Sequence, residues 1–262
     1  MILYQLHQTR LVFISNDARI RAEFRQTHNR GNVMTLQRKD LHTVVENYLQ
    51  DHKPNLRYTA FDYCYNYFHP SIFSPKKYDL EKSCLVLYTY LANWGMLHNS
   101  PRMTKVNHIY LTPTVRYIAE SDSSLWEIDV DNYTNSNIDR IIATYADVKG
   151  LLDLEGSRPV TIVTKILLGV YGFVPAFDNN FCNTFRAIPF ENEKNLGEHC
   201  GFRSFNPYAC QCIKAFYEAN KVEIDNFHKK TKTIDFQTGK NTNLRYPKAK
   251  IIDMYGFQKM ES

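Results

Sequence analysis

The stretch from Leu154 to Arg186 most constrains the fold, because it places a long apolar helix between two turns. It reads LEGSRPVTIVTKILLGVYGFVPAFDNNFCNTFR. The part from 160 to 171 contains no proline, and its apolar residues at 160, 163, 167 and 170 have the spacing of one helical face. Gly156 and Pro159 favour a turn before this helix, and Gly172 suits a left-handed stop after it. The pattern predicts a buried helix that follows a tight turn.

A second helix is expected to begin at Asp178. Pro175 bends the chain after the apolar helix, and Asp178 follows it closely. Aspartate is a favoured N-cap, because its carboxylate accepts a hydrogen bond from a backbone N–H of the first turn. An exposed carboxylate at the same place is also a candidate catalytic anion. The sequence leaves both roles open, and one does not exclude the other.

This order of turn, apolar helix, proline bend and aspartate resembles the helix-hairpin-helix superfamily of DNA base-excision glycosylases. In that superfamily a glycine-containing hairpin holds a DNA phosphate through backbone amides at a helix N-terminus, and an aspartate follows about two dozen residues later. Gly156 and Asp178 are 22 residues apart. TKILLGVYGF is similar to the connecting helix of the family, and FVPAFDNNF stands where its aspartate segment would. About 33 of the 262 residues carry the resemblance.

The resemblance implies a monofunctional DNA glycosylase with Asp178 as its catalytic residue. Breaking an N-glycosidic bond develops positive charge on the deoxyribose, which a fixed anion stabilises while it orients the attacking water. The target nucleotide must be flipped out of the duplex to reach such a site. Bifunctional members place a lysine nucleophile where this chain has Val160, so no lysine-dependent lyase step is expected. TKILLGVYGFVPAFD also resembles a prokaryotic group that includes antiviral glycosylases acting on modified phage bases.

The resemblance further implies an all-α fold, with two helical subdomains around a cleft. DNA is the expected partner, with contacts from Gly156, Arg158, Thr161 and Lys165. The family's Gly-hydrophobic-Gly hairpin reads GSR here, so Arg158 would supply part of the phosphate grip. Lysines and amides at a helix start often position DNA phosphates, although a solvated face is the favoured interpretation of Lys165. No cofactor or metal is expected.

The segment from Phe61 to Phe68, FDYCYNYF, is the candidate for the opposite wall of the cleft. Three aromatic residues, at 61, 65 and 68, have helical spacing and are expected in the core. Asp62, Tyr63 and Asn66 then lie on the face that is free to reach a cleft. We expect them to stack on the flipped base or to read its hydrogen-bonding edge, although an amphipathic core helix is the simpler alternative.

Elsewhere the periodicity predicts helices. They cover 36–50, 58–68, 79–98, a stretch from 138 to 152, and 208–222. The segment 79–98 carries a stripe at 80, 84, 87, 91 and 94, so Trp94 is expected to be packed in the core. Only 11–14 and 250–255 suggest short extended pieces.

The chain is expected to be one cooperative domain. The polar stretch ESDSSLWEIDVDNYTNSN suggests a loop between an N-terminal helical layer, 1–130, and a hairpin-containing unit, 131–262. The apolar run from 11 to 14 is too short for a signal peptide or a spanning helix, so the expectation is a cytoplasmic protein with no membrane contact.

Charge and cysteine content narrow the function only a little. The chain has 32 basic and 27 acidic residues, which permits a nucleic-acid surface without requiring one. The C-terminal lysines, from Lys229 to Lys250, are either an electrostatic arm along DNA or a charged surface tail. His199, Cys200, Cys210 and Cys212 lack a C-x2-C pair, so ordinary reduced thiols are favoured over a zinc site.

A second class of function fits the same sequence. A non-catalytic helical protein that binds DNA or another partner would retain the scaffold and leave every base attached. A nuclease is disfavoured, because the sequence shows no carboxylate cluster suited to metal ligation. No required protein partner is indicated.

Overall fold

The computed structural model describes residues 41–71, 78–99, 102–154, 159–188, 202 and 204–258. The chain divides into two units, Met1–Asp40 and Leu41–Ser262. Every feature below belongs to the second unit. The subdivision that the sequence predicts near residue 130 stays a prediction.

The described part is built mainly of helices. Residues 41–50 are helical, and the other α-helices are α3 (Ala60–Phe68), α4 (Leu80–Asn93), α5 (Met96–Asn99), α6 (Thr112–Glu120), α7 (Asn135–Leu152), α8 (Val160–Tyr171), α9 (Asn179–Ala187), α11 (Pro207–Ala219), α12 (Lys221–Lys230) and α13 (Lys248–Gln258). Short 3-10 turns are η1 (Arg57–Thr59), η2 (Met103–Lys105), η3 (His108–Leu111), η4 (Ser123–Glu127) and η5 (Val130–Asn132). Strands β1 (Lys232–Ile234) and β2 (Asn241–Arg245) form an antiparallel hairpin. The coarse prediction of a mainly helical fold is confirmed.

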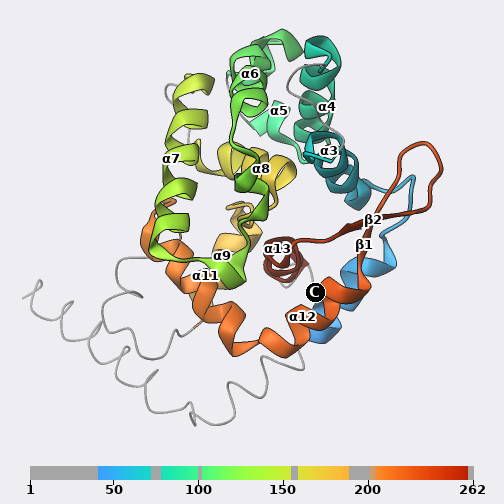
Figure 1. The fold of residues 1–262 in the computed structure, drawn as a ribbon, viewed down its shortest axis with the longest axis vertical. Coiled ribbons are helices and arrows are strands. Elements are labelled where there is room, and N and C mark those ends of the chain that lie inside the picture. Colours follow the sequence, from blue (N-terminus) through green and yellow to red (C-terminus); the bar gives the residue numbers. More distant parts are fainter. Residues whose placement is uncertain are drawn as a thin grey trace, which may run out of the picture. The chain divides into compact units, whose positions relative to one another are not determined.

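Two central helices, α8 and α13, are surrounded by the others (Figure 1). Helices α3, α4 and α7 pack against α8, whereas α9 and α12 pack against α13. Helix α8 is buried on all sides from Ile162 to Tyr171. That explains its apolar sequence, since a helix covered on every face has no polar stripe to keep.

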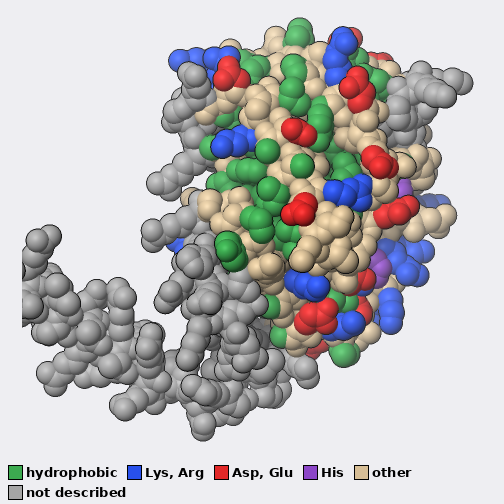
Figure 2. All heavy atoms as spheres, turned by 60° about the vertical axis from the view of Figure 1, so that its left-hand side comes forward, with side chains coloured by type: hydrophobic (Ala, Val, Ile, Leu, Met, Phe, Trp, Pro, Cys, Tyr) green, Lys and Arg blue, Asp and Glu red, His purple; other side chains and the backbone are tan. Residues whose placement is uncertain are grey.

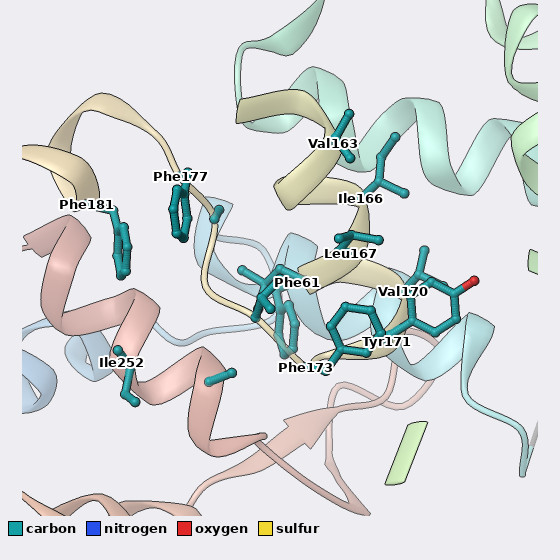
Figure 3. Packing of buried hydrophobic residues seen from close by; sticks show 14 of the residues in the cluster. Phe61, Val163, Ile166, Leu167, Val170, Tyr171, Phe173, Phe177, Phe181 and Ile252 are labelled. Carbon is teal, nitrogen blue, oxygen red and sulfur yellow. The ribbon is translucent and has the colours of Figure 1, made fainter. Parts of the chain in front are cut away.

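The predicted stop at Gly172 is confirmed. Its φ is 76°, and its N–H donates to the carbonyls of Leu167 and Leu168. This left-handed C-terminal conformation favours glycine, which has no Cβ to clash. The chain then crosses the core as an irregular connector from Phe173 to Phe177, whose apolar side chains pack among residues of α3, α8 and α13 (Figure 3).

Several helices begin where the sequence supplies a capping side chain. Asp79, Thr134 and Asn206 each accept a hydrogen bond from a backbone N–H of the first turn of α4, α7 and α11. Such caps satisfy donors that have no partner within the helix. The predicted helices over 58–68 and 138–152 correspond to α3 and α7, and the predicted helix over 36–50 is confirmed for 41–50.

Three sequence predictions are corrected. The segment 250–255 is not extended but lies within α13, because tertiary burial outweighs the weak strand preference of its isoleucines. The helix expected over 79–98 is broken after Asn93, where Gly95 has a φ of 73° and α5 follows. The helix expected over 208–222 ends at Ala219, and α12 begins after Asn220. The segment 11–14 lies outside the described residues.

Within the described segments, no helix combines the length and the apolar character needed to cross a membrane. Figure 2 shows one face of the molecule, on which the described basic and acidic side chains are interspersed. Mixed charge of this kind produces no strong field of one sign on that face.

Candidate functional site

Asp178 is the N-cap of α9. Its Oδ1 accepts a hydrogen bond from the Phe181 N–H at 2.9 Å, and its Oδ2 lies 3.0 Å from the Lys165 Nζ. The Asp178 side chain is 15 % exposed. The predicted capping role is therefore confirmed, and the side chain keeps a small exposed surface. Its catalytic role stays a prediction.

Lys165 does not lie on a solvated face, as the sequence favoured. It is 4 % exposed, because α8 is covered on all sides, and its ammonium is paired with Asp178. One turn earlier, the Thr161 hydroxyl donates to the carbonyl of Phe177 at 2.9 Å. Both side chains thus tie α8 to the connector and to the start of α9. The hairpin positions Gly156 and Arg158 lie outside the described residues.

A second buried ion pair lies on α13. The Lys250 Nζ is 2.7 Å from the Asp253 Oδ2 and 3.1 Å from the Tyr48 hydroxyl oxygen. The other carboxylate oxygen of Asp253 accepts a hydrogen bond from the Ala176 N–H at 3.0 Å. Asp253 therefore fixes the connector two residues before Asp178. The predicted basic arm or surface tail is wrong for Lys250, which is 1 % exposed.

The indole ring of Trp94 lies close to the ammonium groups of both ion pairs. The Lys165 Nζ is 4.7 Å from the centroid of its indole ring, and the Lys250 Nζ is 5.4 Å from it. The Arg57 guanidinium carbon lies 4.9 Å from the same centroid. Cations at these distances are attracted to the face of an indole ring, the most favourable aromatic partner. The predicted burial of Trp94 is confirmed, with an exposed fraction of 6 %.

We call this group the Trp94 cluster. It consists of Arg57, Trp94, Lys165, Asp178, Lys250 and Asp253.

Two tyrosines extend the aromatic surface of the cluster. The rings of Tyr58 and Trp94 are parallel within 8° at a centroid separation of 6.3 Å, and Tyr48 stacks on Tyr58 at 4.0 Å. Burial, followed by the nearby Asp253 carboxylate, raises the pKa of Tyr48 well above its usual range. Tyr48 is thus a neutral hydroxyl group that accepts a hydrogen bond from Lys250. A cavity of about 280 Å³ lies at the edge of this group, and its described lining includes Arg57 and Tyr58.

Asp62 does not face a cleft, which corrects the predicted base pocket for this residue, while Asn66 is largely buried and held by β1. Asp62 has no exposed surface, and its Oδ2 accepts hydrogen bonds from the Ile234 N–H and from His52, both at 2.7 Å. Asn66 donates to the Ile234 carbonyl at 2.9 Å and accepts from the Thr233 hydroxyl at 2.6 Å. Both side chains bind β1 and dock the hairpin on α3, and Asp62 also accepts hydrogen bonds from His52 and Tyr246.

Tyr63 lies on a different surface from the Trp94 cluster. Its hydroxyl donates to the Pro54 carbonyl at 2.5 Å, and its ring meets the exposed Phe236 ring edge-on. A groove of about 590 Å³ runs between α3, α4 and the hairpin turn, and Tyr63, Asn66, Leu85 and Phe236 are among its lining residues. Two of the three predicted base-pocket residues therefore border this groove, while Asp62 borders neither surface.

The cysteines add no metal site in the part of the chain that can be described. Cys210 and Cys212 are buried in α11, while His199 and Cys200 lie outside the described residues. Among the described side chains, no three His, Cys, Asp or Glu residues come together as metal ligands would.

Sequence reasoning missed most of the Trp94 cluster. Arg57, Lys250 and Asp253 carry no motif, and 156 residues separate Trp94 from Lys250 along the chain. One signal was present, since Lys250 and Asp253 are an oppositely charged i, i+3 pair in the mainly apolar segment KIIDMYGF. Two opposite charges one turn apart in an apolar helix indicate that they are buried as an ion pair.

Comparison with known proteins gives no relative for this arrangement. No family model, curated protein or solved structure matches the chain. Any functional inference therefore depends on the geometry of the site itself.

Proposed function

We propose that this protein is a monofunctional DNA glycosylase that hydrolyses the N-glycosidic bond of a flipped, modified base. The observation that supports it best is the partly exposed Asp178 side chain, whose carboxylate is held by one N–H and one ammonium at the start of α9. An anion whose partners are already in place needs no reorganisation as positive charge develops nearby. A carboxylate that stabilises the positive charge of the sugar needs this fixed position.

In this mechanism Asp178, Lys165 and Asp253 have different roles. As the bond between C1′ and the base nitrogen breaks, the base leaves with the electron pair and the sugar gains positive charge. Asp178 stabilises this charge and accepts the proton of the water that attacks C1′. Lys165 fixes the direction of the Oδ2 atom, because its ammonium lies 3.0 Å away. Asp253 holds the connector through the Ala176 N–H, which keeps Asp178 at its position.

An aromatic ring near Arg57 offers a contact for a flipped nucleotide. In this proposal Tyr58, which lines the cavity, takes the role expected of Asp62, Tyr63 and Asn66, and the buried Trp94 ring packs parallel to it. Stacking on aromatic side chains is worth roughly 1–3 kcal/mol per base and tolerates different bases. The cavity beside Tyr58 is close to the lower end of the size range of ligand pockets.

A second candidate function is favoured by the same two contacts of Asp178. Both of its carboxylate oxygens already have a partner, as in a purely structural cap and ion pair. A non-catalytic helical protein that binds DNA would use Asp178 to order α9 and nothing more. Such a protein would bind DNA through its cations with strong salt dependence and release no base.

One assay separates the two functions. Oligonucleotides with unmodified, deaminated, alkylated, oxidised or hydroxymethylated bases are incubated with the full chain and then treated with mild alkali. Strand cleavage that appears only after alkali indicates base loss and supports the glycosylase. Salt-sensitive binding with no alkali-labile site in any of these substrates supports the non-catalytic protein. Base release from modified phage DNA would further support a role in antiviral defence.

A further inference from the structure

The Trp94 cluster carries more positive than negative charge. Lys165 is paired with Asp178, and Lys250 with Asp253. Arg57 lies over the rings of Trp94 and Phe257, at 4.9 and 5.9 Å, and forms no ion pair with a described residue. The guanidinium group therefore retains the capacity to bind an anion.

Arg57 is also the exposed member of the cluster. Its neighbours Leu56 and Tyr58 line the same cavity of about 280 Å³, together with Asp51. Asp51 lines the same cavity and forms no ion pair with Arg57, whose guanidinium lies over the Trp94 ring instead. Stacking on two aromatic rings restricts the guanidinium, which lowers the entropy cost of binding an anion.

A second observation also points to a ligand. The indole Nε1–H of Trp94 is buried and has no acceptor among the described residues. A buried donor without an acceptor costs about 1–3 kcal/mol, and an acceptor supplied by a bound molecule would offset this cost. The orphan donor belongs to the ring over which the three cations gather.

We infer that Arg57 and Trp94 form a binding site for a phosphate group of a nucleic-acid strand. The inference rests on the proposed function, because it places on one strand both this phosphate and the sugar that lies against Asp178. Contacts of 4.9, 4.7 and 3.0 Å lead in turn from Arg57 to the Trp94 ring, to Lys165 and to Asp178. Arginine is suited to this role, since its planar fork donates two parallel hydrogen bonds to phosphate oxygens.

Direct binding measurements test the site without relying on base release. The probe is a labelled oligonucleotide with a stable abasic analogue, measured by fluorescence anisotropy between about 50 and 200 mM salt. The full chain carries Asp178→Asn, so that no substrate is consumed. We expect Arg57→Gln to weaken binding about 10-fold at low salt, and to reduce the slope of log affinity against log salt by about 1. Arg57→Lys should bind with intermediate affinity.

A matched control is Arg116→Gln, which removes an exposed arginine on α6 that has no described partner. It should keep the affinity and the slope of the parent. If Arg57→Gln also keeps both, the phosphate site is refuted. Thermal unfolding of the two variants should coincide, because both arginines are exposed; a large loss for Arg57→Gln alone would assign the residue to the fold instead.

Tryptophan emission identifies the source of the phosphate. The chain has two tryptophans, so a Trp126→Phe background reports on Trp94 alone. The oligonucleotide should change this emission, and Arg57→Gln should abolish the change. Inorganic phosphate and a free deoxynucleoside monophosphate are the comparison probes. If either alters the emission at concentrations as low as the oligonucleotide, the site binds free phosphate compounds and the strand assignment is wrong.

The outcomes for this site and for the glycosylase can be told apart. If no substrate loses a base but Arg57→Gln still reduces the salt slope, the phosphate site is supported and the glycosylase activity is refuted. If bases are released and Arg57→Gln binds like its parent, the glycosylase activity is supported and the phosphate site is refuted.

Discussion

The ammonium of Lys165 lies 3.0 Å from the carboxylate of Asp178, so a buried cation of α8 orients the N-cap residue of α9. The two side chains are 5 % and 15 % exposed. A pair of this kind contributes little net stability, because desolvation offsets the attraction between the charges. Removing one partner is costly, however, since the other charge is left without compensation.

We expect Lys165→Met to reduce the free energy of unfolding by about 2 kcal/mol. This is less than for a fully buried pair, because solvent reaches part of Asp178. Urea denaturation measures the change. The matched test is the double variant Lys165→Met with Asp178→Asn, which should recover at least 1 kcal/mol by removing the unpaired charge. Simple additivity of the two single variants would show that the residues do not interact.

Asp178→Asn should abolish base release while keeping the fold. Asparagine remains a good N-cap, so α9 is retained, although the buried Lys165 ammonium loses its counter-charge and the free energy of unfolding falls. Asparagine also lacks the charge that stabilises the sugar cation. The rate of formation of alkali-labile sites should fall at least about 100-fold. Asp139→Asn, which changes an exposed acid of α7, is the control and should react at the parent rate. Equal rates for both variants would remove Asp178 from the mechanism.

Asp253 is expected to be the most sensitive acid of the cluster. Asp253→Ala leaves Lys250 buried without a carboxylate and the Ala176 N–H without an acceptor. The free energy of unfolding should fall by roughly 3–5 kcal/mol. For Asp139→Ala we expect a change within about 0.5 kcal/mol, as is usual for surface sites. A loss for Asp253→Ala no larger than that would contradict the buried arrangement of α13.

Close packing of α4 on α8 depends on Gly169. A Cβ at this position would lie 2.5 Å from the Tyr90 Cε1 atom. Gly169→Ala should therefore destabilise the protein by about 1–3 kcal/mol through overpacking. The contrasting variant is Gly150→Ala, in α7, where a Cβ meets nothing within 4 Å. It should be neutral or stabilise by up to about 1 kcal/mol, because alanine favours the helix. Equal melting temperatures for the two variants would contradict this packing.

Local signals were sufficient for the end of α8 and the start of α9. The φ of Gly172 and the cap at Asp178 follow from properties of one residue and its immediate neighbours. The burial of Trp94 also follows from local spacing, because a residue on the apolar face of a helix turns toward the core. These features depend on the backbone within a few residues and can be inferred without the fold.

Pairing across the core could not be predicted in the same way. Lys165 and Lys250 look like surface lysines in the sequence, since nothing next to them shows that an acid will face them. Asp62 was expected to be available for a ligand. Its carboxylate instead accepts a hydrogen bond from the backbone N–H of Ile234 in β1, 172 residues away in the sequence. The sequence by itself determined the caps, the helix stop and the apolar faces, because these depend on local geometry. Only the tertiary structure decided which charges are buried together, because burying a charge becomes tolerable only when distant segments bring its partner to it.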